Sequence, residues 1–260
     1  MSRKIRIGAQ LQPQHADYSH IRDAVMRAEE LGVDIVFNWD HFFPLYGEPE
    51  GKHFECWTML GAWAEQTEKV ELGALVSGGG YRNPDLLADM ARTVDHMSGG
   101  RLILGVGSGW FEKDYDEYGY EFGTAGSRLD YFGGEYLPRI KARLAALNPA
   151  PLREIPMLIG GGGEKKTLKF VAEFGTIWHT FGDIEVLQRK AGILAEHCAR
   201  IGRDVAEIER SSELSRSDEQ GANAMADDGI TLFTVGMGGP DYDFDALQKW
   251  LTWRDARNAG

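Results

Sequence analysis

A histidine beside an aspartate is the clearest pair of chemical groups in the sequence. Asp40 and His41 follow a short apolar run at residues 34–37, and Phe42 comes next. Imidazole gains and loses a proton near neutral pH, so His41 is a candidate proton partner that Asp40 would orient. The alternative is metal ligation, which needs further ligands, and of the other histidines only His179 follows a strand-like run. We therefore expect no metal.

Four consecutive glycines at residues 160–163 follow another apolar run and precede a helix expected from Glu164. Glycine lets the backbone approach an anion closely, and free N–H groups at a helix start carry partial positive charge. These properties predict a phosphate-binding loop, and the alternative is a flexible connection. The segment is not a Walker loop, because no Gly-Lys followed by Ser or Thr occurs in the required frame.

Two further glycine-rich segments also follow strand-like runs. Residues 105–109 resemble a dinucleotide fingerprint, but Trp110 occupies the position of its third glycine. Either a flat ring lies against this backbone, or these are ordinary glycines at a barrel corner. Residues 77–81 read Ser-Gly-Gly-Gly-Tyr, which could form a bulge or a floor beneath a ligand, or a plain loop.

Aromatic side chains gather at the same strand ends. Core packing is the usual role of aromatic residues, but it explains them less well in polar loops beyond strands. A concave mouth with aromatic walls and few polar groups suits a flat cofactor. The set comprises Trp39, Phe42, Phe43, Tyr46, Tyr81, Trp110, Phe111 and Trp178.

The elements that would position these residues alternate between short apolar runs and amphipathic stretches. Strands are expected at residues 5–10, 34–37, 70–76, 101–106, 156–159, 176–179, 208–211 and 230–235. Helices are expected up to Gly32 and at residues 56–66, 84–97, 128–147, 164–174, 184–201, 218–225 and 244–256, with a polar loop at 108–127. Eight such units favour an α/β fold, a (β/α)8 TIM barrel in a single domain over residues 1–260. A doubly wound sheet is the competitor, but its strand ends would spread along an edge instead of meeting at one mouth.

Composition narrows the class of partner. The chain has 28 Lys and Arg against 40 Asp and Glu, a net charge of −12, which disfavours nucleic acids and anionic membranes. Its two cysteines, Cys56 and Cys198, are too few for a disulfide framework. No apolar run approaches the ~20 residues of a membrane helix, and no signal peptide is evident. We expect a soluble, cytoplasmic protein that acts on a small molecule.

With these segments assembled, the sequence resembles the luciferase-like monooxygenase superfamily and, within it, the oxidoreductases that use the deazaflavin coenzyme F420. The most specific stretch runs from Tyr81-Arg82-Asn83-Pro84 through a helix to residues 98–110. Residues 40–42 and 155–163 also match motifs of that family. The resemblance implies a TIM barrel, a homodimer, and hydride transfer between the deazaflavin C5 and a small organic substrate.

The resemblance also implies roles for individual residues. His41 would contact the ring or the substrate. Val76 and Ser77 would lie behind the ring, where the family often carries a bulge with a non-prolyl cis peptide. The residues that would border the cofactor are Gly107, Ser108, Gly109 and Trp110, and those that would hold its phosphate are Gly161, Gly162 and Gly163.

The sequence departs from the family pattern in places that bear on mechanism. Some deazaflavin dehydrogenases carry a glutamate proton donor where this chain has Trp110, so that role is not transferred. His41 is the proton partner we expect, with Glu112 in reserve, and residues 111–127 are the expected lid. Two alternatives stay open, an FMN-dependent monooxygenase and a flavin-binding protein without turnover. The motifs do not separate F420 from FMN, because both have a tricyclic ring, a ribityl chain and a phosphate.

Overall fold

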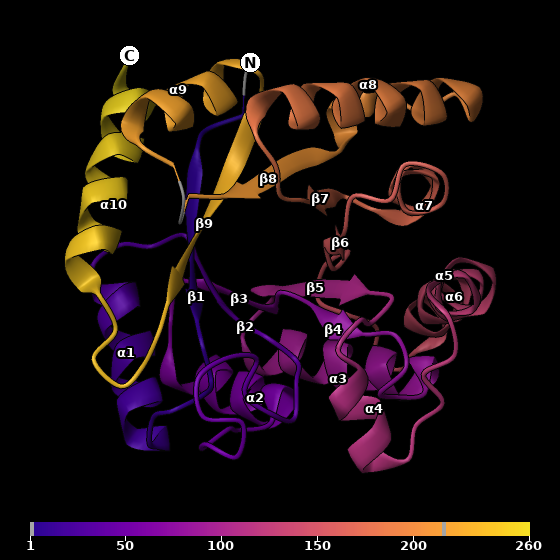
Figure 1. The fold of residues 1–260 in the computed structure, drawn as a ribbon, viewed down its shortest axis with the longest axis horizontal. Helices are drawn as coiled ribbons and strands as arrows, with labels where there is room; N and C mark the ends of the chain where they lie inside the picture. Colours follow the sequence, from indigo (N-terminus) through magenta and orange to yellow (C-terminus); the bar gives the residue numbers. More distant parts are fainter. Residues whose placement is uncertain (1–2, 215–216) are drawn as a thin grey trace.

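The computed structural model describes residues 3–214 and 217–260 as strands and helices that alternate along the chain (Figure 1). The strands are β1 (Arg6–Leu11), β2 (Ile35–Asn38), β3 (Glu71–Ala74), β4 (Ser77–Gly78), β5 (Leu102–Gly107), β6 (Met157–Gly160), β7 (Ile177–His179), β8 (Glu209–Glu213) and β9 (Ile230–Met237). The helices are α1 (Tyr18–Glu30), α2 (Cys56–Gln66), α3 (Pro84–Met97), α4 (Glu112–Tyr118), α5 (Ala125–Tyr131), α6 (Leu137–Ala146), α7 (Thr167–Phe174), α8 (Ile184–Arg200), α9 (Glu219–Asp227) and α10 (Phe244–Ala259). A π-helical turn, η1 (Phe132–Tyr136), joins α5 to α6, and a 3-10 turn, η2 (Val205–Glu207), precedes β8.

The strands close into a parallel barrel. Their order is β3-β2-β1-β9-β8-β7-β6-β5-β4, and a further pairing of β3 with β5 closes the ring. Both β3 and β4 pair with β5, β3 through Leu102 and Ile103 and β4 through Val106 and Gly107, so they are two parts of one barrel strand. The predicted α/β fold, a single-domain (β/α)8 TIM barrel, is therefore confirmed.

The barrel interior is filled by a small apolar cluster. The Phe37 ring of β2 extends into this interior. The neighbouring strands β1 and β3 carry glycine where they pass the ring. A Cβ added to Gly8 would lie 2.8 Å from the Phe37 ring, and one added to Gly73 would lie 3.1 Å from it. Ile35 and Phe37 alternate along β2, as residues of a barrel interior do; the cluster is Ile35, Phe37, Leu75, Ile103, Leu158, Ile177 and Leu232.

A larger apolar layer lies between the barrel and the helices, and capping groups fix where those helices begin. The Asn83 side chain accepts hydrogen bonds from the N–H groups of Asp85 and Leu86, and Pro84 occupies the first turn of α3. At the amino-terminal end of the barrel, Arg6 pairs with Glu71 and with Glu209, each at 2.5 Å. Among the helices of the described residues, none is both long and apolar enough to cross a membrane.

Most element boundaries agree with the sequence analysis, and α2 and α3 have the bounds expected for them. The loop expected at 108–127 was wrong in part, because it contains α4. The helix expected at 128–147 begins at Ala125 and is interrupted by η1, where Gly133 lies so close to the Phe170 ring that a Cβ would collide with it. Helix α7 begins at Thr167, not at Glu164, since residues 164–166 form a turn.

Candidate active site

The carboxyl ends of the strands surround a cavity of about 460 Å³. Its walls come from the ends of β1, β2, β5, β6 and β7 and from the segments that follow them, which is where TIM barrels place their chemistry. The surface is mostly apolar and aromatic, with a few polar groups. The lining residues are Gln10, Trp39, Asp40, His41, Leu45, Leu75, Val76, Gly78, Tyr81, Gly107, Ser108, Gly109, Trp110, Gly160, Gly161, His179 and Phe181.

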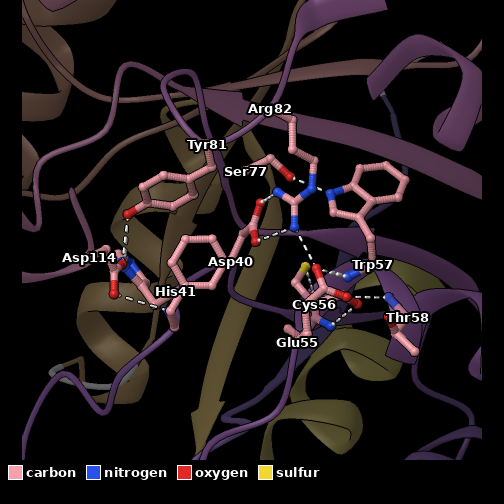
Figure 2. Close-up of polar contacts among 12 residues, drawn as sticks. Asp40, His41, Glu55, Cys56, Trp57, Thr58, Ser77, Tyr81, Arg82 and Asp114 are labelled. Atoms are coloured by element: carbon pink, nitrogen blue, oxygen red, sulfur yellow. Dashed lines mark hydrogen bonds and ion pairs between the residues drawn. The ribbon is translucent and has the colours of Figure 1, made fainter. Parts of the chain in front are cut away.

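His41 is held by a carboxylate from α4 (Figure 2). Its Nδ1 lies 2.7 Å from Oδ2 of Asp114, and the Tyr81 hydroxyl donates to the same oxygen over 2.7 Å. The other oxygen of Asp114 accepts the backbone N–H of Phe42 at 3.0 Å. Because a carboxylate only accepts hydrogen bonds, Nδ1 of His41 carries a proton, and in the neutral imidazole Nε2 is then the nitrogen without one. Burial and the bond to Asp114 raise the pKa of Tyr81, so the phenol stays neutral.

Asp40 belongs to a different network, and the expectation that it orients His41 was wrong. Its carboxylate receives two bonds from Arg82, at 2.5 and 3.1 Å (Figure 2). Arg82 also pairs with Glu55, which caps α2. Burial raises the pKa of Asp40, and the bonds from Arg82 oppose that shift. The Asp40 side chain is therefore fixed between β2 and the start of α3, while His41 turns toward α4.

The floor of the cavity lies where the third barrel strand is divided. The peptide between Leu75 and Val76 is cis, at the place where the family resemblance implies such a bond. Val76 lines the cavity, and a Cβ added to Gly107 would lie 2.8 Å from it. Ser77 is fully buried and its side chain faces away from the cavity, since its Oγ accepts the Trp57 indole N–H at 2.8 Å.

The four-glycine segment continues from β6 along the rim. Gly161 adopts a φ of +125°, a conformation that favours glycine, and its N–H bonds to the carbonyl of His179 at 2.9 Å. Gly162 lies against Thr180 and the Lys190 ammonium, so a Cβ added there would collide with both side chains. Within residues 3–214 and 217–260, Lys190 forms no ion pair. The Lys190 ammonium therefore lies beside the Gly162 backbone, next to the Gly161 N–H that is already bonded to His179.

His179 lines the cavity as a second imidazole, at the end of β7, which lies opposite β2 in the order of the barrel strands. Its Nδ1 lies 2.8 Å from Oγ of Ser211, and burial lowers its pKa to about 4. Its Nε2 is buried and has no hydrogen-bond partner among the described residues. The ring of Phe181 packs edge-on against it, with centroids 5.0 Å apart.

Aromatic residues form the walls, as expected, but two of them stand out into solvent. Trp110 is 63% exposed and Phe181 is 59% exposed, on the β5 and β7 sides of the mouth. Trp39 is buried and fixed, because its indole N–H donates to Nε2 of His53 at 3.1 Å. Burial lowers the pKa of His53 to about 4, which keeps its Nε2 available as the acceptor.

The structure brings together most of the residues expected at the site. Those that line the cavity are His41, Asp40, Val76, Gly107, Ser108, Gly109, Trp110 and Gly161. Ser77, Gly162 and Gly163 lie behind or beside it, and Glu112 is exposed at the start of α4, away from the lining. Asp114 and Lys190 were not predicted from the sequence. No local signal marked them, because Asp114 lies 73 residues from His41 and Lys190 lies in the middle of an amphipathic helix.

Comparison with known proteins places this geometry among related enzymes. The family described as luciferase-like monooxygenase matches residues 2–251 of the chain. An F420-dependent glucose-6-phosphate dehydrogenase of Rhodococcus erythropolis is 27% identical over 245 residues, which are 84% of this chain and 70% of that enzyme. Two other curated relatives match over shorter stretches, and this chain spans 25% of the length of one and 57% of the other.

Solved structures share the fold. An F420-dependent secondary alcohol dehydrogenase, in complex with an F420–acetone adduct, superposes with a TM-score of 0.85 at 18% identity, covering 97% of this chain and 99% of that one. The oxygenating constituent of 3,6-diketocamphane monooxygenase, from Pseudomonas putida and in complex with FMN, gives a TM-score of 0.62 at 14% identity. That match covers 80% of this chain and 67% of the other. Both cofactors therefore occur on this architecture.

Proposed function

This chain belongs to the luciferase-like monooxygenase family, and from that premise we propose that it is an F420-dependent oxidoreductase. It would transfer a hydride between F420 and a small organic substrate. The observation that carries the proposal is the His41–Asp114 pair, in which Asp114 engages Nδ1 of a histidine that lines an apolar cavity. The names of the sequence relatives support F420 as the cofactor.

The residues around the cavity fit a flat, phosphorylated cofactor. Glycine backbone surrounds Val76 on two sides, since a Cβ on Gly107 or on Gly160 would come within 2.8 or 3.0 Å of its methyl groups. This leaves a thin floor against which a ring system could lie. The phosphate would be held at Gly161, Gly162 and Gly163, where the Lys190 ammonium adds a positive charge to the backbone N–H groups.

Bound F420 would supply a carbon that accepts or donates a hydride. The protein contributes a group that accepts or donates a proton, and a cavity that excludes water and orients the substrate. Asp114 holds the Nδ1 proton of His41, so Nε2 is free to take the hydroxyl proton of an alcohol, or to return it in the reverse direction. The Asp114 carboxylate then stabilises the imidazolium that forms. Tyr81 and the Phe42 N–H keep that carboxylate in place.

Titration of the protein with oxidised F420 and, separately, with FMN tests the proposal. Cofactor and tryptophan fluorescence both report binding, because Trp39 and Trp110 line the cavity. We expect tighter binding of F420. Tight FMN binding with no measurable F420 binding would contradict the proposal and favour an FMN-dependent monooxygenase. Binding of either cofactor without turnover of any substrate would favour the third alternative, a binding protein.

We also propose a homodimer, as the family resemblance implies. Helix α3 exposes Leu86 and Met97, which are 53% and 39% accessible and lie three helical turns apart on one face. Light scattering would measure the mass in solution. Replacement of both residues by Glu should produce a monomer if this face forms the contact.

A further inference from the structure

His179 is a buried polar group that the proposed proton transfer does not use. It lies at the end of β7, across the cavity from His41 on the segment after β2, and it is 3% exposed. Its Nε2 has no hydrogen-bond partner among the described residues. An unsatisfied buried polar atom destabilises the fold, so its position on a residue of the cavity wall calls for a partner that enters the cavity.

The hydrogen bond between Nδ1 of His179 and Ser211 is compatible with either tautomer of the imidazole. Nδ1 contacts Oγ of Ser211 at 2.8 Å, and a serine hydroxyl can either donate or accept a hydrogen bond. When Ser211 donates, Nε2 carries the proton and can donate to a carbonyl. When Ser211 accepts, Nε2 is unprotonated and can accept from a hydroxyl. This pair therefore suits a group that is a hydroxyl on one side of a reaction and a carbonyl on the other.

The charges at the cavity restrict the rest of the ligand. In the described part of the chain, the lining includes no Lys, Arg or Glu, and Asp40 already accepts two bonds from Arg82. Burial lowers the pKa of His179 to about 4, so it is neutral at pH 7. A phosphate or carboxylate beyond the cofactor would lose its hydration without gaining a cation.

We propose that His179 binds the reacting oxygen of an uncharged alcohol or ketone, together with His41, and that the enzyme excludes phosphorylated substrates from this cavity. This inference rests on the proposed function and defines its substrate class. Trp39, Trp110 and Phe181 would contact the apolar remainder of the substrate. His41 then moves the proton, and His179 positions the oxygen that carries it.

Imidazole resonances of the ¹⁵N-labelled protein test the inference without relying on turnover. The signals absent from His179→Phe identify His179, and His20→Phe, an exposed change on α1, is the matched control. Cyclohexanol, cyclohexanone and acetophenone are titrated into free and F420-loaded protein, and glucose 6-phosphate is the charged probe. We expect the neutral probes to shift the Nε2 signal of His179 and the sugar phosphate to leave it unchanged.

Binding affinities of two His179 variants give a quantitative test. His179→Phe keeps an aromatic ring but removes both nitrogens, and it should weaken binding of the neutral probes about 10- to 100-fold while F420 affinity changes less than about twofold. His179→Gln, which restores a hydrogen-bonding group, should recover part of that loss and also shows whether the site still folds. A loss of F420 affinity equal to the loss of probe affinity would overturn the proposal by assigning His179 to the cofactor.

Two other outcomes separate this inference from the proposed function. A His179 signal that responds to glucose 6-phosphate, or to none of the neutral probes, would overturn the inference even when F420 binds. Failure of F420 to bind the wild-type protein would contradict the proposed function alone. In that case a shift of the His179 signal by neutral ketones in the free protein would still support the substrate class.

Discussion

Asp40 and Asp114 are both buried carboxylates beside the same cavity, yet their hydrogen-bond networks end in different places. The network of Asp40 runs through Arg82 to Glu55 and closes within the protein (Figure 2). The network of Asp114 runs through His41 and ends at a nitrogen that faces the cavity. A polar group whose bonds are all made inside the fold contributes to stability. A chain of bonds that stops at a cavity wall is available for chemistry.

The largest effect that this contrast predicts is at His41. Replacement by Ala should lower kcat about 10²–10⁴-fold, because it removes the proton acceptor. The Kd for F420 and the thermal midpoint should change little. Steady-state kinetics and cofactor titration measure these quantities, and a wild-type kcat in the variant would exclude His41 as the proton partner.

Asp40→Asn should affect stability instead. It leaves Arg82 buried with only Glu55 as an ionic partner, and breaking a buried ion pair costs about 3–5 kcal/mol. Urea unfolding would show this loss in the free energy of unfolding, while the folded protein should keep most of its kcat. A variant of normal stability with a collapsed kcat would place Asp40 in the chemistry after all.

Asp114→Asn is the matched change in the other network. The amide does not hold the Nδ1 proton of His41 as a carboxylate does, and it no longer stabilises the imidazolium, so kcat should fall about 10²-fold. Steady-state kinetics on the folded variant measure this change. An unchanged kcat would show that Asp114 only supports the fold.

Substitutions at the glycine loop, residues 160–163, and at Lys190 beside it should have a smaller effect, on the affinity for F420. Lys190→Met should raise the Kd for F420 about tenfold, because it removes one charge-assisted contact to a phosphate. Lys169→Met, on neighbouring α7, is the control and should change nothing. Gly162→Val should weaken binding more, since its side chain would collide with Thr180 and Lys190. Equal affinities for all three variants would place the phosphate elsewhere.

The smallest expected effect is the contribution of His179 to the pH dependence of the free energy of unfolding. Its pKa is about 4 in the folded protein, below the value of about 6.5 expected in an unfolded chain. Between these values the unfolded state binds a proton that the folded state does not, so stability falls as the pH falls. Between pH 7 and pH 5.5 this should remove about 1 kcal/mol, which His179→Phe should restore. His53 contributes a similar loss that the variant retains, and denaturant unfolding at both pH values distinguishes the two.

Local patterns predicted the fold well and the partners of the site residues poorly. Helix α3 could be placed because Asn83, Pro84 and the 3.6-residue period are all local signals. Asp40 was assigned to His41 because the two are adjacent, but neighbouring side chains in an extended segment point to opposite sides. Asp114 lies on a seven-residue helix in a polar segment, and only the closed barrel brings that helix to β2.

Helix α4 therefore contributes to the site through Asp114, although no residue of this helix is among those that line the cavity. The segment that contains it was expected to be a lid, and it carries the carboxylate that fixes His41 through bonds to both the imidazole and the Phe42 N–H. A displacement of α4 that opened the cavity would separate Asp114 from His41 in the same movement. The proton-transfer geometry of His41 therefore depends on how α4 packs against the segment after β2, through the single side chain of Asp114.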